Sequence, residues 1–230
     1  MQPSGPLRAL MATPIPESVM RLALLLVPMS LAAQEVTGPP GPRLLLERDH
    51  EIRLARSAAP ASASAQARVW FFQNGAYVVA DSGGNGVECY VSRSWPESLE
   101  PHCFDEEGAR TIMRLEMRGV ELAHAGIARE EAARQLAVGL ADGTFRLPQR
   151  PAMSWMMSSA QVLYSDVGQR VGAWRPHLMI YFPYLTAEGL GMTANDMAAG
   201  IVVDAGKPTS NLMIVVPNAV DPAPAGSARP

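Results

Sequence analysis

The sequence predicts an α+β domain with a mainly antiparallel sheet, an N-terminal helix and a central helical pair packed on one face. Strand-forming segments occupy both halves of the chain, and two segments with helical periodicity lie between them. A shorter helical segment precedes them all. The chain is 48% hydrophobic and 18% charged, so it can form a core.

The first recognisable feature is an export signal, which takes no part in the fold. The stretch Met20–Ala33 has a basic start at Arg21, a short apolar centre and small residues at its end. Four prolines precede it, which makes Met20 an alternative start of translation. The apolar centre has about a dozen residues, against the roughly 20 of a membrane-spanning helix. We expect removal of residues 1–33, no transmembrane anchor, and a soluble protein in the periplasm or outside the cell.

The mature chain is predicted to hold one domain between two loose ends. Residues 34–43 are rich in proline and glycine and predict a flexible leader. The α+β domain is expected over residues 44–217. Residues 218–230 are again proline-rich and predict a disordered tail.

The N-terminal half begins with a helix over residues 44–56, which stops before Pro60. Strands are expected over 67–72 and 76–80, joined by Asn74 and Gly75, a strong hairpin signal. A glycine-rich turn at 83–86 leads to a third strand over 87–91. We expect these three strands to form an antiparallel meander.

The helical pair follows. Asp105 is a suitable N-cap, with Glu106 and Glu107 in the first turn, where the helix dipole favours acids. This helix is expected to run to about His124, and Gly126 fits its C-terminal stop. A second helix is expected from about residue 128 to 143.

The C-terminal half is predicted to return to strands, separated in places by turns at 166–168 and 205–208. The expected strands are 153–157, 161–164, 178–182, 200–203 and 212–216.

Cys89 and Cys103 are the two cysteines of the chain, 14 residues apart. In an oxidising compartment such thiols commonly pair, so we expect a disulfide between them. A free redox pair and thiolate metal ligands are the rival interpretations, but both usually come with a C-x-x-C spacing that is absent here.

Composition and motifs exclude several functions. The formal net charge of −3 gives no indication of nucleic acid or anionic lipid as a partner. The turn at 83–86 lacks the Lys and Ser or Thr of a phosphate-binding loop. The G-x-S-x-G and H-E-x-x-H motifs are also absent. We therefore predict no cofactor and no metal.

The segment Trp174–Tyr184 has the densest mixture of aromatic and polar side chains in the chain. Strand alternation places His177, Met179 and Tyr181 on one face, where they could line a pocket. Together with Tyr184 they are our candidate binding residues. The alternative is that these side chains are ordinary strand and core residues.

Two other groups suggest chemistry. His102 lies close to Asp105, Glu106 and Glu107 in the sequence, a combination suited to acid/base catalysis or metal binding, although helix capping is the simpler explanation of the acids. We expect His102 to be a surface histidine held by the disulfide. Several methionines could bind copper(I) through their thioethers, or fill gaps in the core. They are Met153, Met156, Met157, Met179, Met192, Met197 and Met213.

Several segments carry a resemblance to known sequences: Asn85–Gly86, Cys89–Arg93, Cys103–Gly108, 150–159, 176–186 and 213–217. Together they resemble a group of uncharacterised exported bacterial proteins, over most of the chain from about Leu54 to Pro217. The resemblance implies paired cysteines and a retained segment at 177–184. It implies no activity, cofactor or fold.

The leading hypothesis is an exported, non-enzymatic domain that binds a small molecule or an envelope protein through the segment 177–184. The alternative is a periplasmic hydrolase or metal-dependent enzyme that uses His102 or His177. A copper-handling protein is the third hypothesis.

Overall fold

The computed structural model describes residues 45–94, 98–164, 170–193 and 200–226, all within the unit Thr37–Pro230. An eight-stranded sheet and five α-helices confirm the α+β class. The sheet order is β2-β1-β3-β4-β5-β8-β10-β9, and β6 and β7 form a separate ribbon. The predicted signal peptide and leader lie outside the described residues.

The helices are α1 (Arg48–Arg56), α2 (Ala61–Ser64), α3 (Glu106–Arg110), α4 (Ile112–His124) and α5 (Arg129–Ala141), with a 3-10 turn η1 (Glu188–Leu190). The strands are β1 (Arg68–Gln73), β2 (Ala76–Asp81), β3 (Glu88–Ser92), β4 (Glu100–Phe104), β5 (Ala152–Met156), β6 (Leu163–Tyr164), β7 (Arg170–Gly172), β8 (His177–Tyr181), β9 (Ile201–Val203) and β10 (Asn211–Val215). No helix in these ranges is long and apolar enough to cross a bilayer.

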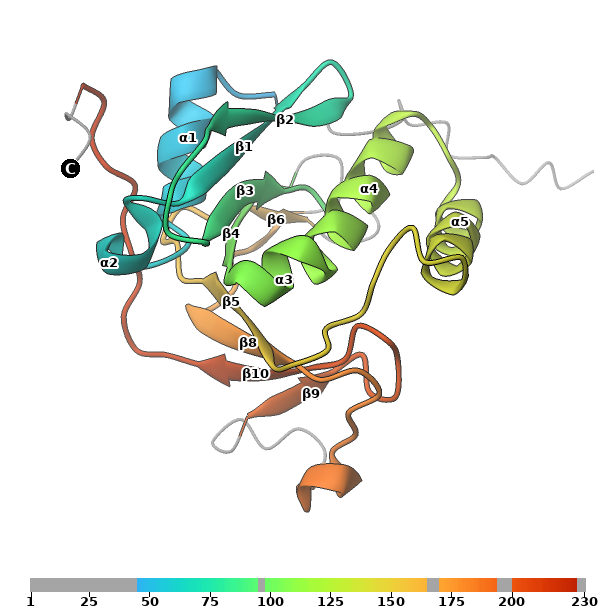
Figure 1. The fold of residues 1–230 in the computed structure, drawn as a ribbon. Coiled ribbons are helices and arrows are strands. Elements are labelled where there is room, and N and C mark those ends of the chain that lie inside the picture. Colours follow the sequence, from blue (N-terminus) through green and yellow to red (C-terminus); the bar gives the residue numbers. More distant parts are fainter. Residues whose placement is uncertain (1–44, 95–97, 165–169, 194–199, 227–230) are drawn as a thin grey trace, which may run out of the picture. The chain divides into compact units, whose positions relative to one another are not determined.

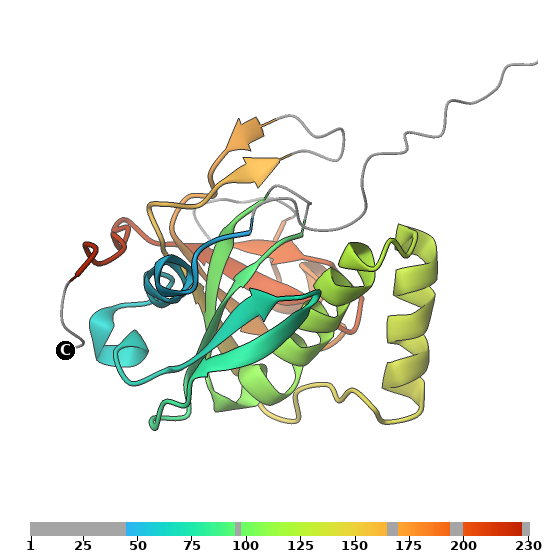
Figure 2. The same ribbon diagram turned by 90° about the horizontal axis from the view of Figure 1, so that it is seen from above.

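Helices cover both faces of the sheet, whereas we expected them on one face. Figures 1 and 2 show α1 on one side of the strands and α3 and α4 on the other. The cause lies in β3 and β4, whose residues are buried on both faces. Cys89, Val91 and Cys103 pack with α1, while Tyr90 and Phe104 pack with α4.

The β1–β2 hairpin agrees with the prediction, but the meander is wrong. Asn74 and Gly75 both have positive φ, 53° and 83°, as the predicted turn requires. β3, however, pairs with β1 and runs parallel to it. The connection passes so close to the start of β1 that a Cβ on Gly83 would lie 2.1 Å from the backbone nitrogen of Arg68. This close return brings β3 beside β1 instead of β2.

β4 is a central strand that the sequence did not predict. It pairs with β3 along its whole length, and with β5 at Cys103 and Phe104. Pro101 lies inside it, and proline normally argues against a central strand because it cannot donate to the ladder. Here the β5 pairing begins only after Pro101, so the missing donor is tolerated.

The helical pair differs from the prediction at one point. Asp105 caps α3 by accepting a hydrogen bond from the backbone of Gly108 at 2.7 Å. The expected single helix then breaks at Thr111, whose φ and ψ are −120° and −89° and whose hydroxyl donates to the Glu107 carbonyl. Gly126, with φ of 79°, ends α4 as predicted.

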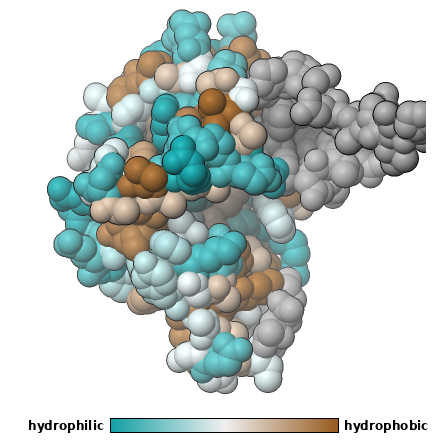
Figure 3. Space-filling view, turned by 90° about the vertical axis from the view of Figure 1, so that its right-hand side faces the viewer, coloured by the Kyte–Doolittle hydropathy of each residue, from teal (hydrophilic) through white to brown (hydrophobic). Residues whose placement is uncertain are grey.

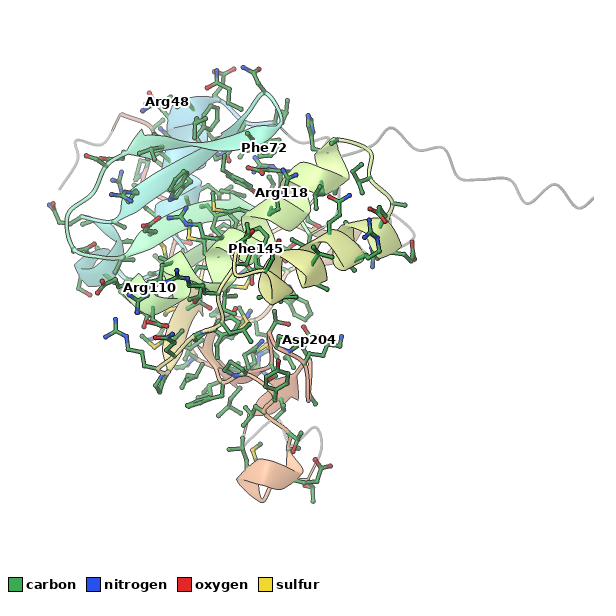
Figure 4. The ribbon with its side chains drawn as sticks, turned by 45° about the vertical axis from the view of Figure 1, so that its right-hand side comes forward. Arg48, Phe72, Arg110, Arg118, Phe145 and Asp204 are labelled. Carbon is green, nitrogen blue, oxygen red and sulfur yellow. A yellow bond between two sulfur atoms is a disulfide. The ribbon has the colours of Figure 1, made fainter. Side chains whose placement is uncertain are left out.

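α5 packs on α4 and not on the sheet (Figure 2). The ring of Phe145, labelled in Figure 4, packs against Gly139 of α5. The outward side of this region is mostly hydrophilic, with scattered apolar residues, in Figure 3. Val138 of α5 is half exposed.

β5, β8, β9 and β10 lie within one residue of their predicted ranges, whereas β6 starts two residues later than predicted and β7 was not predicted. The predicted turn at 166–168 falls outside the described residues. β5, β8 and β10 are antiparallel neighbours, with β9 at the edge. Past Pro217, where we expected the domain to end, Val220 forms a parallel bridge with Ser158. Ordered backbone pairing thus extends into the predicted tail.

Two covalent or ionic links hold the β3–β4 hairpin. The predicted disulfide is present: Cys89 and Cys103 face each other across the two strands, with their Cα atoms 4.0 Å apart. Just past β3, Arg93 forms a fully buried ion pair with Glu51 of α1, with N–O distances of 2.7 and 3.0 Å. The Cys89–Cys103 disulfide fixes the register of β4 against β3. A slip of one residue would turn every β4 side chain to the other face of the sheet.

Candidate functional site

A cavity of about 480 Å³ lies between α4 and the sheet. α4 supplies its roof with Glu116, Gly119, Val120 and Ala123. Its floor is the face of β4, β5, β8 and β10 opposite to α1. A cavity of this size falls in the range of small-molecule sites.

The floor follows from strand register. His177 faces Met156 on β5 and Val215 on β10. Continuing the β4–β5 register by one residue places His102 beside Met156. In the next row, Met179 faces Met213. The floor therefore begins at His102 and Glu100 on β4, and continues through the methionine side chains of β5 and β8 to Met213 on β10.

His102 is the most informative residue of the cavity. Its side chain is only 3% exposed, and its Nδ1 lies 3.3 Å from Oε2 of Glu116. The same carboxylate oxygen accepts a hydrogen bond from the Tyr90 hydroxyl at 2.5 Å. When the ring is neutral and Nδ1 donates to Glu116, Nε2 is a hydrogen-bond acceptor. That Nε2 is buried and has no hydrogen-bond partner among the described residues.

Glu100 lies two residues before His102 on the same face of β4. Its carboxylate accepts hydrogen bonds from the backbone and hydroxyl of Ser94. Burial raises the pKa of Glu100, and the charge of nearby Glu116 adds to that effect, while Ser94 and His102 oppose it. Two carboxylates and an imidazole thus share one corner of the cavity.

His177 is held in one orientation. Its Nδ1 lies 2.7 Å from the carbonyl oxygen of Arg175, so Nδ1 carries the proton and Nε2 the lone pair. Burial lowers the pKa of His177, which favours this neutral ring. Its ring meets Trp174 edge to face.

The cavity also contains Asn211 and Tyr181, which are direct partners across β8 and β10. Asn211 donates through Nδ2 to the Thr209 carbonyl, which identifies the other amide atom as oxygen. That Oδ1 is buried and has no partner in the described part of the chain. The Tyr181 hydroxyl contacts the sulfur of Met179 at 3.6 Å. Asp204, labelled in Figure 4, also lines the cavity.

Of the four candidate binding residues, the structure brings His177, Met179 and Tyr181 into the cavity. Tyr184 does not line it. The chain leaves β8 after Tyr181, and Tyr184 has a positive φ of 65° and is 60% exposed. It lines a separate hollow with Pro208 and residues after α5.

The expectation that His102 lies at the surface is wrong, because β4 is a central strand with both faces covered. The neighbouring acids have structural contacts. Asp105 caps α3, and buried Glu107 accepts hydrogen bonds from the backbone of Gln149 and the side chain of Arg150.

The described ranges contain no group of three or more His, Cys, Asp or Glu side chains placed to hold a metal. Three of the methionines considered for copper, Met156, Met179 and Met213, line the cavity. Met153, Met157 and Met192 do not line it, and Met197 lies outside the described residues. Copper binding stays a prediction.

Sequence reasoning missed Glu100, Glu116 and Asn211. Glu100 had an available signal: with Cys103 facing Cys89, alternation places residues 100, 102 and 104 together on the other face. Glu116 and Asn211 join the site only through the packing of α4 and the order of the strands.

Comparison with known proteins finds no matching family model, no matching curated protein and no matching solved structure.

Proposed function

We propose that this chain is an exported protein that binds a small molecule, without transforming it, in the cavity beneath α4. The observation that carries the proposal is the pair of buried, unpartnered acceptors in the cavity wall, Nε2 of His102 and Oδ1 of Asn211. Buried polar atoms nearly always have a partner, because leaving one unpaired costs about 1–3 kcal/mol. A ligand that donates to these atoms would remove that cost.

The construction of the cavity supports the same proposal. The disulfide and the Glu51–Arg93 pair hold β3 and β4, so the polar corner is fixed before any ligand enters. Apolar walls with a few placed polar groups are typical of small-molecule sites. Export is supported by the predicted signal sequence and by the disulfide, since disulfides persist in oxidising compartments.

Native mass spectrometry of gently purified protein tests the proposal. We expect a retained small molecule, which an Ala123→Leu variant loses, because Ala123 lines the cavity and leucine suits a helix. Ala133→Leu is the matched control, since Ala133 is an exposed residue of α5 outside the cavity. Equal retention by both variants would contradict the proposal.

The contact between Glu116 and His102 favours a second candidate, an enzyme with His102 as general base. A carboxylate on Nδ1 orients an imidazole whose Nε2 is free to take a proton, as catalysis requires. No described serine, threonine or cysteine is hydrogen-bonded to that Nε2, so the base would act on the ligand or on water. If the released molecule is converted on incubation with the protein, and His102→Gln abolishes conversion, this second candidate is correct.

A further inference from the structure

The cavity offers acceptors where a ligand's polar group would lie. At the β4 corner these are the carboxylates of Glu100 and Glu116 and Nε2 of His102. Glu100 and His102 share a strand face, and Glu116 contacts His102, so the three lie together. The side chain of His102 is 3% exposed, and its Nε2 has no hydrogen-bond partner among the described residues. The corner therefore offers a buried imidazole nitrogen in addition to the two carboxylates.

Among the described residues, His102 is the basic side chain in ion-pair contact with these carboxylates, through Glu116. Within the described ranges neither Glu100 nor Glu116 forms an ion pair with an arginine or lysine. Arg93 also lines the cavity, but both of its terminal nitrogens donate to Glu51. A third cavity carboxylate, Asp204, is paired with Lys207 at 2.8 Å. The β4 corner therefore holds two carboxylates against at most one positive charge, that of a protonated His102.

Away from this corner the cavity is largely apolar, although His177, Asp204 and Asn211 also line it. Met156, Met179 and Met213 form its floor, and Val120 contributes to its roof. Thioethers adapt to ligands of different shape and contribute no charge. A ligand in the cavity therefore contacts carboxylates at one corner and mainly apolar side chains elsewhere.

We infer that the ligand is an organic cation, a small molecule with an ammonium or amidinium group on an apolar body. The inference rests on the proposed binding function and names the class of ligand for that site. An ammonium group has three N–H donors, no acceptor and a positive charge, which suits a corner that contains two carboxylates. The apolar body would lie over the methionines.

Other ligand classes fit this corner less well. An anion would meet two carboxylates, and a neutral alcohol would leave their charges uncompensated in a largely buried place. A positive group would also offset the burial that raises the pKa of Glu100. Hard metal ions are disfavoured because Glu100, Glu116 and His102, although neighbours, are not placed to hold a metal together in the described part of the chain.

The test compares three probes with the same apolar body: hexylamine, hexan-1-ol and hexanoate. Each is titrated into the full chain, freed of any retained molecule, by calorimetry near neutral pH. A charge-assisted hydrogen bond to a carboxylate is roughly twice as strong as a neutral one, so we expect hexylamine to bind at least about tenfold more tightly than hexan-1-ol. Hexanoate should bind most weakly.

Glu100→Gln and Glu116→Gln keep the shape of the side chain and remove its charge. Each should weaken hexylamine binding by about tenfold or more while changing hexan-1-ol binding by less than about threefold. Unchanged hexan-1-ol binding shows that the variant is folded with an intact cavity. Glu131→Gln on α5, whose carboxylate pairs with Arg134 at the surface, is the matched control and should bind all three probes normally.

The outcomes separate the inference from the proposed function. If hexan-1-ol or hexanoate binds as tightly as hexylamine, or the glutamine variants keep hexylamine affinity, the cation inference is wrong although the cavity binds ligands. If no probe binds and native mass spectrometry finds no retained molecule, the proposed function itself fails. Retention of a copper ion in place of an organic molecule would also overturn the inference.

Discussion

Replacing Arg93 by methionine should destabilise the domain strongly. Arg93 and Glu51 are both completely buried, and two guanidinium nitrogens donate to the two carboxylate oxygens at 3.0 and 2.7 Å. Methionine fills much of the same space but leaves the Glu51 carboxylate with a single donor, the backbone of Phe72 at 3.1 Å. Breaking such a pair by removing one partner costs about 3–5 kcal/mol, because a buried charge is left uncompensated.

That loss is a large part of the roughly 5–15 kcal/mol by which a domain is stable. The double variant Glu51→Met and Arg93→Met should be more stable than Arg93→Met alone, because it buries no charge. It still loses the acceptor for Phe72, which costs about 1–3 kcal/mol. Urea unfolding with the disulfide intact gives the free energies for a double-mutant cycle. A loss below about 1 kcal/mol for Arg93→Met would refute this reasoning.

Three further predictions concern stability. Replacing Cys89 and Cys103 by alanine should lower the free energy of unfolding by about 3 kcal/mol, and urea midpoints equal to those of the oxidised protein would contradict this. The raised pKa of Glu100 means that its stabilising contribution is complete below the ordinary value of 4.5 and is lost as pH rises through the raised pKa. Glu100→Gln should therefore gain stability relative to wild type as pH rises above 4.5, whereas parallel pH profiles would argue against a raised pKa. Gly108→Ala should lower the free energy of unfolding by about 1–3 kcal/mol, because a Cβ there would lie 2.6 Å from Cδ1 of Phe104. The control is Gly84→Ala, where a Cβ would meet nothing within 4 Å and stability should stay nearly unchanged. Thermal unfolding measures both variants.

Local signals in the sequence predicted the parts of the fold that depend on local chemistry. Asn74 and Gly75 gave the hairpin because a tight two-residue turn needs positive φ. Asp105 and Gly126 marked helix ends correctly for the same kind of reason. The disulfide followed from cysteine count and the predicted export signal. Alternation also placed His177, Met179 and Tyr181 on one face, and the structure brings all three into the cavity.

Features that depend on distant partners could not be predicted this way. The parallel β1–β3 pair depends on how the glycine-rich connection passes over Arg68. β4 was missed because Pro101 is a strong local signal against a strand, and only the limited pairing with β5 makes it acceptable. Without β4, the sequence could not reveal that Glu100 and His102 share a buried face.

The roof of the site shows the same limit. Glu116 lies on a helix whose other contacts give no indication of a ligand, and its role appears only where α4 crosses β4. Buried Glu51 likewise looks like one charge among several in a surface helix. Each carboxylate contacts a residue more than ten positions away in the chain: Glu116 contacts His102, and Glu51 contacts Arg93. These contacts determine the roles of the two carboxylates, and the local sequence does not reveal them.

The most direct test of ligand binding beneath α4 is a nuclear magnetic resonance titration of protein labelled at its methionine methyl groups. The hexyl probes used above serve as ligands, and each methyl signal is assigned by a Met→Leu substitution. We predict that a binding probe shifts the signals of Met156, Met179 and Met213, which line the cavity, and leaves those of Met153 and Met157 unchanged. Shifts confined to methionines outside the cavity, or no shift with any probe, would contradict the proposed binding site.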